Sequence, residues 1–196
     1  SNVTQSGITK LNITVGGNRT NETYSGKQEI LFYDQNTLMI NFSHNFSSKN
    51  LDLSNVTIIK DTNYLIVNFS GQLQGNKTLF ITDNSFITLC VKDAEVSSID
   101  ALSSTCDEAN ETLFTSCLGN SNATTINGTT CTDLGTTIKI ENLQYSAIRG
   151  TVATPAASSA SNAGGGGGGS SGGGNGGGVA AATKIEPELC HDSLPF

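Results

Sequence analysis

The stretch Leu11-Asn12-Ile13-Thr14-Val15 alternates apolar and polar residues with a period of two. A strand with this period turns its three apolar side chains toward a core and its asparagine and threonine toward solvent. The pattern therefore predicts a β protein with polar outer faces. The same outward phase recurs at three further asparagines, in Ile40-Asn41-Phe42, in Val67-Asn68-Phe69, and at Asn55 ahead of Val56 and Ile58.

Apolar runs of strand length follow one another through the first 92 residues. Gly, Asn, Asp or Ser residues close each run, and no amphipathic helix separates them. This spacing, about ten residues, predicts an antiparallel sandwich of immunoglobulin-like architecture rather than a parallel α/β sheet, although the chain has no Trp for the usual buried position. The expected strands are 8–15, 28–34, 37–43, 51–59, 63–70, 77–82 and 86–92.

The tripeptide Asn-x-Ser/Thr, with x not proline, occurs twelve times among the 196 residues. Chance placement of the Asn, Ser and Thr residues would give about five such sequons. N-linked sugars are attached at this tripeptide in exported chains, so we expect an extracellular or cell-surface glycoprotein. The alternative, an Asn-, Ser- and Thr-rich β protein with unused sequons, stays open. The acceptors are Asn2, Asn12, Asn18, Asn21, Asn41, Asn45, Asn55, Asn68, Asn76, Asn110, Asn122 and Asn127.

Four cysteines, Cys90, Cys106, Cys117 and Cys131, lie in the region that follows. In an exported chain they predict a disulfide framework with three connectivities. Pairing Cys90 with Cys106 and Cys117 with Cys131 is favoured, because each ring of about fifteen residues contributes about 3 kcal/mol in the loop-entropy account. A nested pairing stays open.

The segments inside these two rings differ. Residues 93–102 place Val96, Ile99 and Leu102 three apart with acids early, which predicts one short helix. The second cysteine pair flanks a polar stretch with two sequons, which predicts a long hairpin loop closed by its disulfide.

The cysteine-containing region carries one family resemblance. Its run is Ile87-Thr88-Leu89-Cys90-Val91-Lys92-Asp93-Ala94-Glu95-Val96, then Cys106, Asn110-Glu111-Thr112, Cys117 and Cys131-Thr132-Asp133-Leu134-Gly135. This run resembles a module of archaeal cell-surface glycoproteins, in which a sequon-rich β ectodomain precedes a cysteine-containing segment and a Gly-rich or Ser/Thr-rich stalk. The resemblance implies a surface location and says little about activity.

The end of the chain changes in composition. Residues 164–178 contain twelve glycines in fifteen positions, without the Gly-X-Y period of collagen and without the Gly-Lys-Ser/Thr of a phosphate loop. Either this tract is a flexible linker, or it docks on a neighbouring chain with residues 179–196 as a donated strand. Cys190 is the odd cysteine and a candidate for an inter-chain disulfide, unless it pairs beyond this sequence. We call residues 164–196 the assembly tail; Gly164, Gly169, Gly172 and Gly178 are its candidate assembly residues.

These zones define the expected organisation. They are a β-sandwich domain at 1–85, a disulfide-containing β module packed on or continuing it at 86–150, a Ser/Thr/Ala/Pro stalk at 151–163, a polyglycine tract at 164–178 and a C-terminal segment at 179–196.

Composition excludes several classes of function. The charged fraction is 14%, and the net charge of −7 includes only scattered basic residues, so neither nucleic acid nor an anionic membrane is an expected partner. No apolar run reaches the length of about eighteen residues that a membrane span needs. The chain has no Gly-x-Ser-x-Gly, His-Glu-x-x-His or Cys-x-x-Cys, so no catalytic residue, metal or cofactor beyond covalent N-glycans is expected.

Because the sequence begins at Ser1, we expect a cleaved export signal, with an excerpt of a longer precursor as the alternative.

Two classes of function remain. The favoured one is a structural glycoprotein that self-assembles into an extracellular filament, sheath or coat through inter-subunit strand and Gly-tail contacts. Its partners would be copies of itself and other envelope glycoproteins. The alternative is a monomeric stalked adhesin or receptor ectodomain that binds a protein or a glycan.

Overall fold

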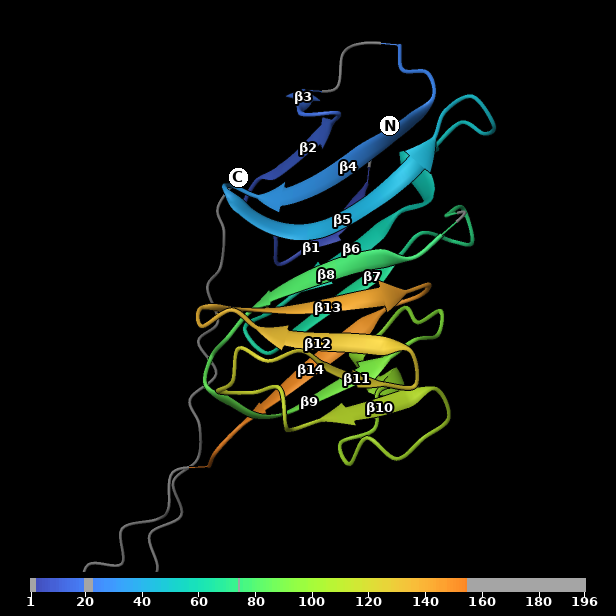
Figure 1. Cartoon of the computed structure of the whole chain (residues 1–196). Helices are drawn as coiled ribbons and strands as arrows, with labels where there is room; N and C mark the ends of the chain where they lie inside the picture. The colour runs from blue at the N-terminus through green and yellow to red at the C-terminus, as the bar shows by residue number, and fades with distance from the viewer. Residues whose placement is uncertain (1–2, 20–22, 74, 155–196) are drawn as a thin grey trace, which may run out of the picture. The chain divides into compact units, whose positions relative to one another are not determined.

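The computed structural model describes residues 3–19, 23–73 and 75–154, which fold mainly as β-strands in two sheets (Figure 1). Sheet A contains, in order across the sheet, β1 (Thr4–Ser6), β6 (Thr57–Lys60), β7 (Tyr64–Asn68), β14 (Ala147–Val152), β9 (Phe86–Lys92) and β10 (Glu111–Phe114). Sheet B contains β11 (Thr124–Ile126), β12 (Thr129–Asp133), β13 (Thr137–Leu143), β8 (Lys77–Thr82), β5 (Thr37–Asn45), β4 (Lys27–Asp34), β2 (Leu11–Val15) and β3 (Asn18–Arg19).

Neighbouring strands pair antiparallel, with one exception between β1 and β6. Those two strands run parallel, with Thr4 opposite Thr57 and Ser6 opposite Ile59. A tight turn makes consecutive strands pair antiparallel, as in the β4–β5 hairpin, where Asp34 is opposite Thr37. Strands far apart in sequence, such as β14 with β7 and β9, also pair antiparallel. The predicted mainly β, antiparallel character is therefore confirmed.

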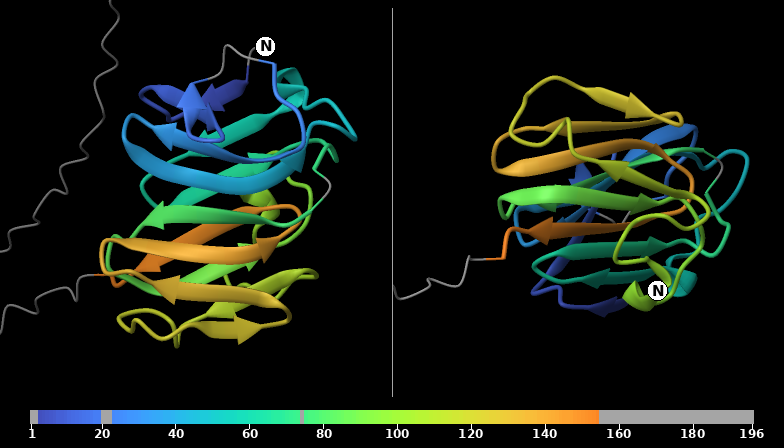
Figure 2. Two further views of the ribbon diagram at one scale, coloured as in Figure 1. Left: turned by 45° about the horizontal axis from the view of Figure 1, so that its top comes forward. Right: turned by 90° about the horizontal axis from the view of Figure 1, so that it is seen from below.

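The inner faces of the two sheets pack on one another and form one apolar core (Figure 2). Alternation along the strands supplies it, because every second side chain of strands such as β4 and β5 is buried. Phe32 and Phe42 from sheet B meet Phe69, which follows β7 of sheet A, with the Phe42 and Phe69 ring centroids 5.0 Å apart. Such edge-to-face aromatic contacts fix how the sheets face one another.

The strands expected in the first 92 residues agree closely with the structure except at two starts. The run expected at 51–59 begins with a 3-10 turn, η1 (Leu53–Asn55), because the Asp52 carboxylate accepts a hydrogen bond from the Ser54 N–H at 2.9 Å. The run expected at 8–15 forms a strand only from Leu11, and Leu11 and Ile13 are half-buried because β2 lies next to the short outer strand β3.

The helix expected at 93–102 is wrong. Only η2 (Ile99–Ala101) forms, as one 3-10 turn. Ser98 is extended, with φ −143° and ψ 152°, and its hydroxyl accepts from the Asp100 N–H, so a continuous helix stops there. The apolar spacing instead serves a loop that covers the outer face of sheet A, where Val96 and Leu102 pack with Ile66 and Ala147.

The two disulfides are Cys90–Cys106 and Cys117–Cys131, the pairs that ring size favoured. The second does not close a long loop. It joins β12 to the segment after β10, and the hairpin β11–β12 itself has a two-residue turn, in which Asn127 and Gly128 have φ of 51° and 84°.

Both sheets contain strands from either side of residue 85. β14 lies between β7 and β9, and β13 pairs with β8, so residues 86–150 continue the same sheets. Thr151 and Val152 belong to β14 rather than to the expected stalk. The rest of that stalk from residue 155, the polyglycine tract at 164–178 and the segment at 179–196 lie outside the described residues. Across the described ranges, no helix is long and apolar enough to cross a membrane.

Candidate binding site

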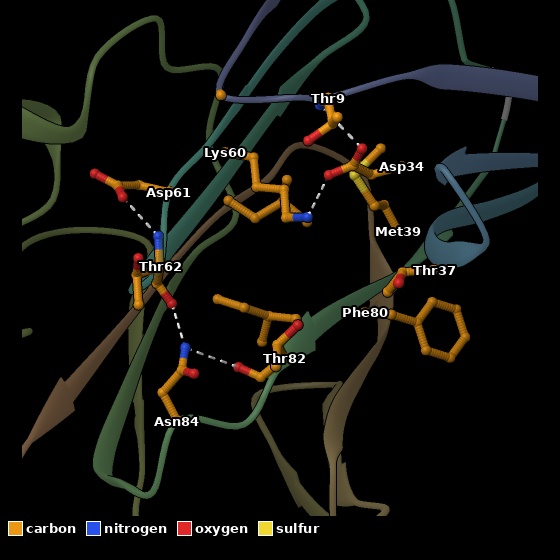
Figure 3. Close-up of a pocket in the computed structure, with 13 residues that line it drawn as sticks. Thr9, Asp34, Thr37, Met39, Lys60, Asp61, Thr62, Phe80, Thr82 and Asn84 are labelled. Carbon is orange, nitrogen blue, oxygen red and sulfur yellow. Dashed lines mark hydrogen bonds and ion pairs between the residues drawn. The ribbon is translucent and has the colours of Figure 1, made fainter.

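A cavity of about 370 Å³ lies between the sheets where β4, β6 and β8 end and β5 and β7 begin (Figure 3). Its floor is apolar, formed by the buried side chains of Met39, Leu65 and Ile81. Polar side chains such as Thr9 and Thr82 line its wall. The combination of an apolar floor and hydrogen-bonding walls suits a small polar ligand.

One ion pair crosses this cavity wall and joins the two sheets. Lys60 at the end of β6 donates from Nζ to Asp34 Oδ2 at the end of β4, at 2.6 Å. The Asp34 carboxylate also accepts from the backbone N–H groups of Thr9 at 3.0 Å and Lys10 at 3.2 Å. Burial raises the pKa of Asp34, but the bond from Lys60 and the two backbone bonds outweigh it, so the pKa is lowered. The Asp34 carboxyl is therefore ionised at neutral pH.

Asn84 ties the opposite side of the cavity together. Its Nδ2 donates to the carbonyl of Thr62, in the turn between β6 and β7, while Asn84 itself follows β8. Figure 3 shows Asn84 and Thr82 across the cavity from Lys60, and the Phe80 ring turned away from it. The polar groups that line the cavity are thus hydroxyls, an amide, the Asp61 carboxylate and the Asp34–Lys60 ion pair. These groups can donate and accept hydrogen bonds to a hydroxyl-rich ligand.

A second charged cluster lies beside the Cys90–Cys106 disulfide. Lys92 Nζ donates to the Ala101 carbonyl and contacts Glu108 Oε2 at 3.0 Å and Glu111 Oε1 at 3.2 Å. The Glu111 side chain is fully buried and also accepts from the N–H and hydroxyl of Ser103. Burial raises the pKa of Glu111, but these hydrogen bonds outweigh it and lower it to about 2. The cluster therefore holds the covering loop on sheet A.

The same region brings three atoms of metal-ligating type together. One ligand atom each from Cys90, Cys106 and Glu111 lies within 4.8 Å of the others. The two sulfurs are joined in the disulfide, and Glu111 is occupied by Lys92 and Ser103. Thiolates, not disulfide sulfurs, bind metal ions, so this group is a structural staple.

The sequon asparagines form the other candidate site. Ten of the twelve lie within the described residues, and none of these ten is buried. Asn12, Asn41 and Asn68 are half-buried on strands, and Asn41 Nδ2 donates to Glu29 Oε1 at 2.9 Å. The seven exposed ones are Asn18, Asn45, Asn55, Asn76, Asn110, Asn122 and Asn127.

Some predicted positions lie outside the part of the chain that the structure describes. These are Asn2, Asn21, the Gly-tail positions Gly164, Gly169, Gly172 and Gly178, and Cys190.

Sequence reasoning missed the cavity and its ion pair. Asp34 and Lys60 are each the last residue of a strand. Charged residues are common at strand ends, so the sequence position of either residue does not predict that the two form an ion pair. Their contact depends on which strand ends face one another across the sheets.

A scan against protein-family models, a search of curated proteins and a search of solved structures found no match for this chain.

Proposed function

We propose that this chain is a structural extracellular glycoprotein that self-assembles into a cell-surface filament, sheath or coat. The exposure of the sequons is the observation that carries this proposal. The strand neighbours of Asn41 and Asn68 are buried (Ile40, Phe42, Val67 and Phe69), yet none of the ten described sequon asparagines is buried. A glycan needs solvent around its attachment point, and all ten positions offer it.

The two disulfides support an extracellular location. Both are ring closures within one chain, Cys90–Cys106 and Cys117–Cys131. Such bonds persist in oxidising compartments and are rare in the cytosol. We propose the surface of an archaeal cell, on the resemblance of the cysteine-containing region, with other envelope glycoproteins as further partners.

The assembly step is assigned to the glycine-rich tail. Twelve glycines in residues 164–178 provide backbone groups without side chains, and residues 179–196 would add as a strand to another copy. An added strand needs a sheet edge, and the described sheets end at β1, β3, β10 and β11. Cys190 would then link neighbouring copies.

The immunoglobulin-like character of the sandwich is also part of this proposal. Two antiparallel sheets that share one core support it. The sheets have six and eight strands, more than an immunoglobulin domain, so the likeness concerns architecture only.

The test is concentration-dependent assembly of the glycosylated full chain, followed by light scattering and electron microscopy. Deletion of residues 164–196 should abolish assembly, whereas Cys190→Ser should retain it if strand addition alone suffices. Glycopeptide mass spectrometry should find sugar on the ten exposed or half-buried asparagines. Polymers that persist without the tail would overturn the assembly route, and bare asparagines throughout would overturn the glycoprotein assignment.

A second candidate is a stalked adhesin or receptor ectodomain that binds a protein or a glycan. The cavity between the strand ends favours it, because Thr82, Asn84 and the Asp34–Lys60 pair offer donors and acceptors above an apolar floor. A glycan array probed with the purified chain tests it. Binding that Asn84→Ala weakens at least tenfold, from a chain that stays monomeric, would favour this candidate over assembly.

A further inference from the structure

One end of the sandwich carries two unpaired sheet edges. Among the described residues, sheet A ends at β10, which pairs only with β9, and sheet B ends at β11, which pairs only with β12. Figure 1 shows both strands at its lower end, and the Cys117–Cys131 disulfide ties the segment after β10 to β12. Unpaired N–H and C=O groups on such edges are a template for strand addition by a second copy.

These edges lack most of the devices that discourage pairing. β10 reads Glu-Thr-Leu-Phe and β11 reads Thr-Thr-Ile, with no Lys or Pro and no bulge in either register. The one charge, on Glu111, is turned inward, fully buried and paired with Lys92 at 3.2 Å. Leu113 is 43% exposed and adds an apolar contact. The shortness of the strands and the inward charge of Glu111 are the two devices that oppose pairing here.

Three sequons flank these two strands. Asn110 is the residue before β10, Asn127 is the residue after β11, and Asn122 precedes β11 by two residues. All three are exposed. The Asn110 carbonyl accepts from the Asp93 N–H at 3.0 Å, which extends the β9–β10 pairing by one residue. A sugar at Asn110 would thus start at the pairing edge itself.

We propose that N-glycans on Asn110, Asn122 and Asn127 block strand addition at β10 and β11 by a second copy of this chain. Paired strands lie only about 4.8 Å apart, so a sugar chain rooted beside the edge occupies the space of an incoming strand. This inference rests on the proposed glycosylation. In this inference, the sugars on these three asparagines determine whether copies associate through β10 and β11. Ordered assembly would then proceed through the tail.

The test compares two triple variants of the full chain, made in a host that glycosylates it. Asn110→Gly/Asn122→Gln/Asn127→Gly removes the edge sequons without creating a new one at Asn120. Glycine keeps the positive φ of 63° at Asn110 and 51° at Asn127. The matched control, Asn45→Ser/Asn68→Ser/Asn76→Ser, removes three sequons at the ends of the interior strands β5, β7 and β8. In the control, serine can still accept the backbone N–H bonds that Asn45 and Asn68 now accept. Neither set of substitutions changes the net charge of the chain.

Light scattering after size-exclusion chromatography measures mass, and hydrogen exchange localises contacts. We expect the edge variant to double in mass relative to the wild type at equal concentration, with slower amide exchange over Glu111–Phe114 and Thr124–Ile126. The control variant should match the wild type. Trimming folded wild-type protein with an endoglycosidase that leaves one sugar per site should move it toward the edge variant, and this comparison stands even if the edge variant fails to fold.

Several outcomes would overturn the inference. They are an edge variant and a trimmed wild type that both keep the wild-type mass, association of the control to the same extent, and association without slower exchange in β10 or β11. Glycopeptide analysis separates the two proposals. Bare Asn110, Asn122 and Asn127 on an otherwise glycosylated chain defeats this inference alone, whereas a chain without any N-glycan defeats the proposed function as well.

Discussion

Lys60 Nζ lies 2.6 Å from Asp34 Oδ2, and this single contact joins the end of β6 in sheet A to the end of β4 in sheet B. Asp34 is 7% exposed and accepts two further backbone hydrogen bonds, from Thr9 and Lys10. The carboxylate therefore holds Thr9 and Lys10, which precede β2, as well as Lys60 in the cavity wall.

Asp34→Ala should lower the free energy of unfolding by about 2–3 kcal/mol, because it leaves a partly buried ammonium and two N–H groups without their acceptor. Asp34→Asn keeps an acceptor for the backbone groups and should cost about half as much. Urea denaturation measures the free energy of unfolding of both variants. It can be followed by tyrosine fluorescence, since the chain has no Trp, or by circular dichroism. Equal costs for the two variants would contradict the assigned role of the backbone bonds.

Glu111 predicts how stability depends on acid. Its pKa is about 2 in the folded protein and near the ordinary value of 4.5 in the unfolded chain. The unfolded state therefore binds more protons between these values, so the free energy of unfolding should fall as the pH is lowered from about 4.5 to 2. Glu111→Gln should be less stable at pH 7 and should show a shallower acid dependence. Thermal unfolding at half-unit pH steps measures this, and parallel curves for both proteins would contradict it.

Lys77 predicts a pH dependence of the same sign, in the alkaline range. It is 2% exposed, and its Nζ donates to the Gln144 carbonyl at 2.5 Å and lies 5.7 Å from the Phe69 ring centroid. Burial lowers its pKa to about 8, partly offset by Asp93. Because the unfolded chain holds this proton up to about pH 10.5, the free energy of unfolding should rise between about pH 8 and 10.5.

The matching variant is Lys77→Met, which fills the same volume without a charge. It should be neutral or stabilising by about 1–2 kcal/mol at pH 7, and it should lose the alkaline rise. A Cys190→Ser background limits thiol exchange at high pH in both proteins. A destabilised Lys77→Met protein that keeps the rise would show that another group titrates.

Gly150 predicts a steric limit in the middle of sheet A. A Cβ added there would lie 2.4 Å from Cδ1 of Phe86, whose ring is part of the core. Gly150→Ala should therefore cost about 1–3 kcal/mol through overpacking. Combining it with Phe86→Leu should cost less than the sum of the two single changes, and additive costs in this double-mutant cycle would contradict the clash.

Local patterns in the sequence predicted the strands well but not their neighbours. The alternation at 28–34 and 37–43 and the two-residue separation between them give the β4–β5 hairpin almost as expected. By contrast, residues 147–152 were not among the expected strands, although β14 lies at the centre of sheet A. Pairing between segments far apart in sequence depends on the whole arrangement of the sheets, which no local period encodes.

The same limit applies to the candidate sites. Sequon phase predicted that Asn41 and Asn68 lie on the less buried face of their strands, because a period of two is a local property. At Asn12 the phase does not appear, since Leu11 and Ile13 are as half-buried as the asparagine. The helix at 93–102 failed because its apolar spacing also suits a loop packed on Ile66 and Ala147. Ring size favoured the two disulfides for a local reason, since both join residues close in sequence.

The central position of β14 has a consequence for how the chain is made. β14 (Ala147–Val152) is the last strand of the described chain, and it pairs with both β7 and β9. A chain that emerges from its N-terminus holds those two strands apart until residue 152 has arrived, and pairings so distant in sequence form slowly. The sandwich is therefore completed late, after every sequon has already passed the site of synthesis. In the glycosylation proposed above, the attaching enzymes would meet an open, extended chain rather than a finished surface.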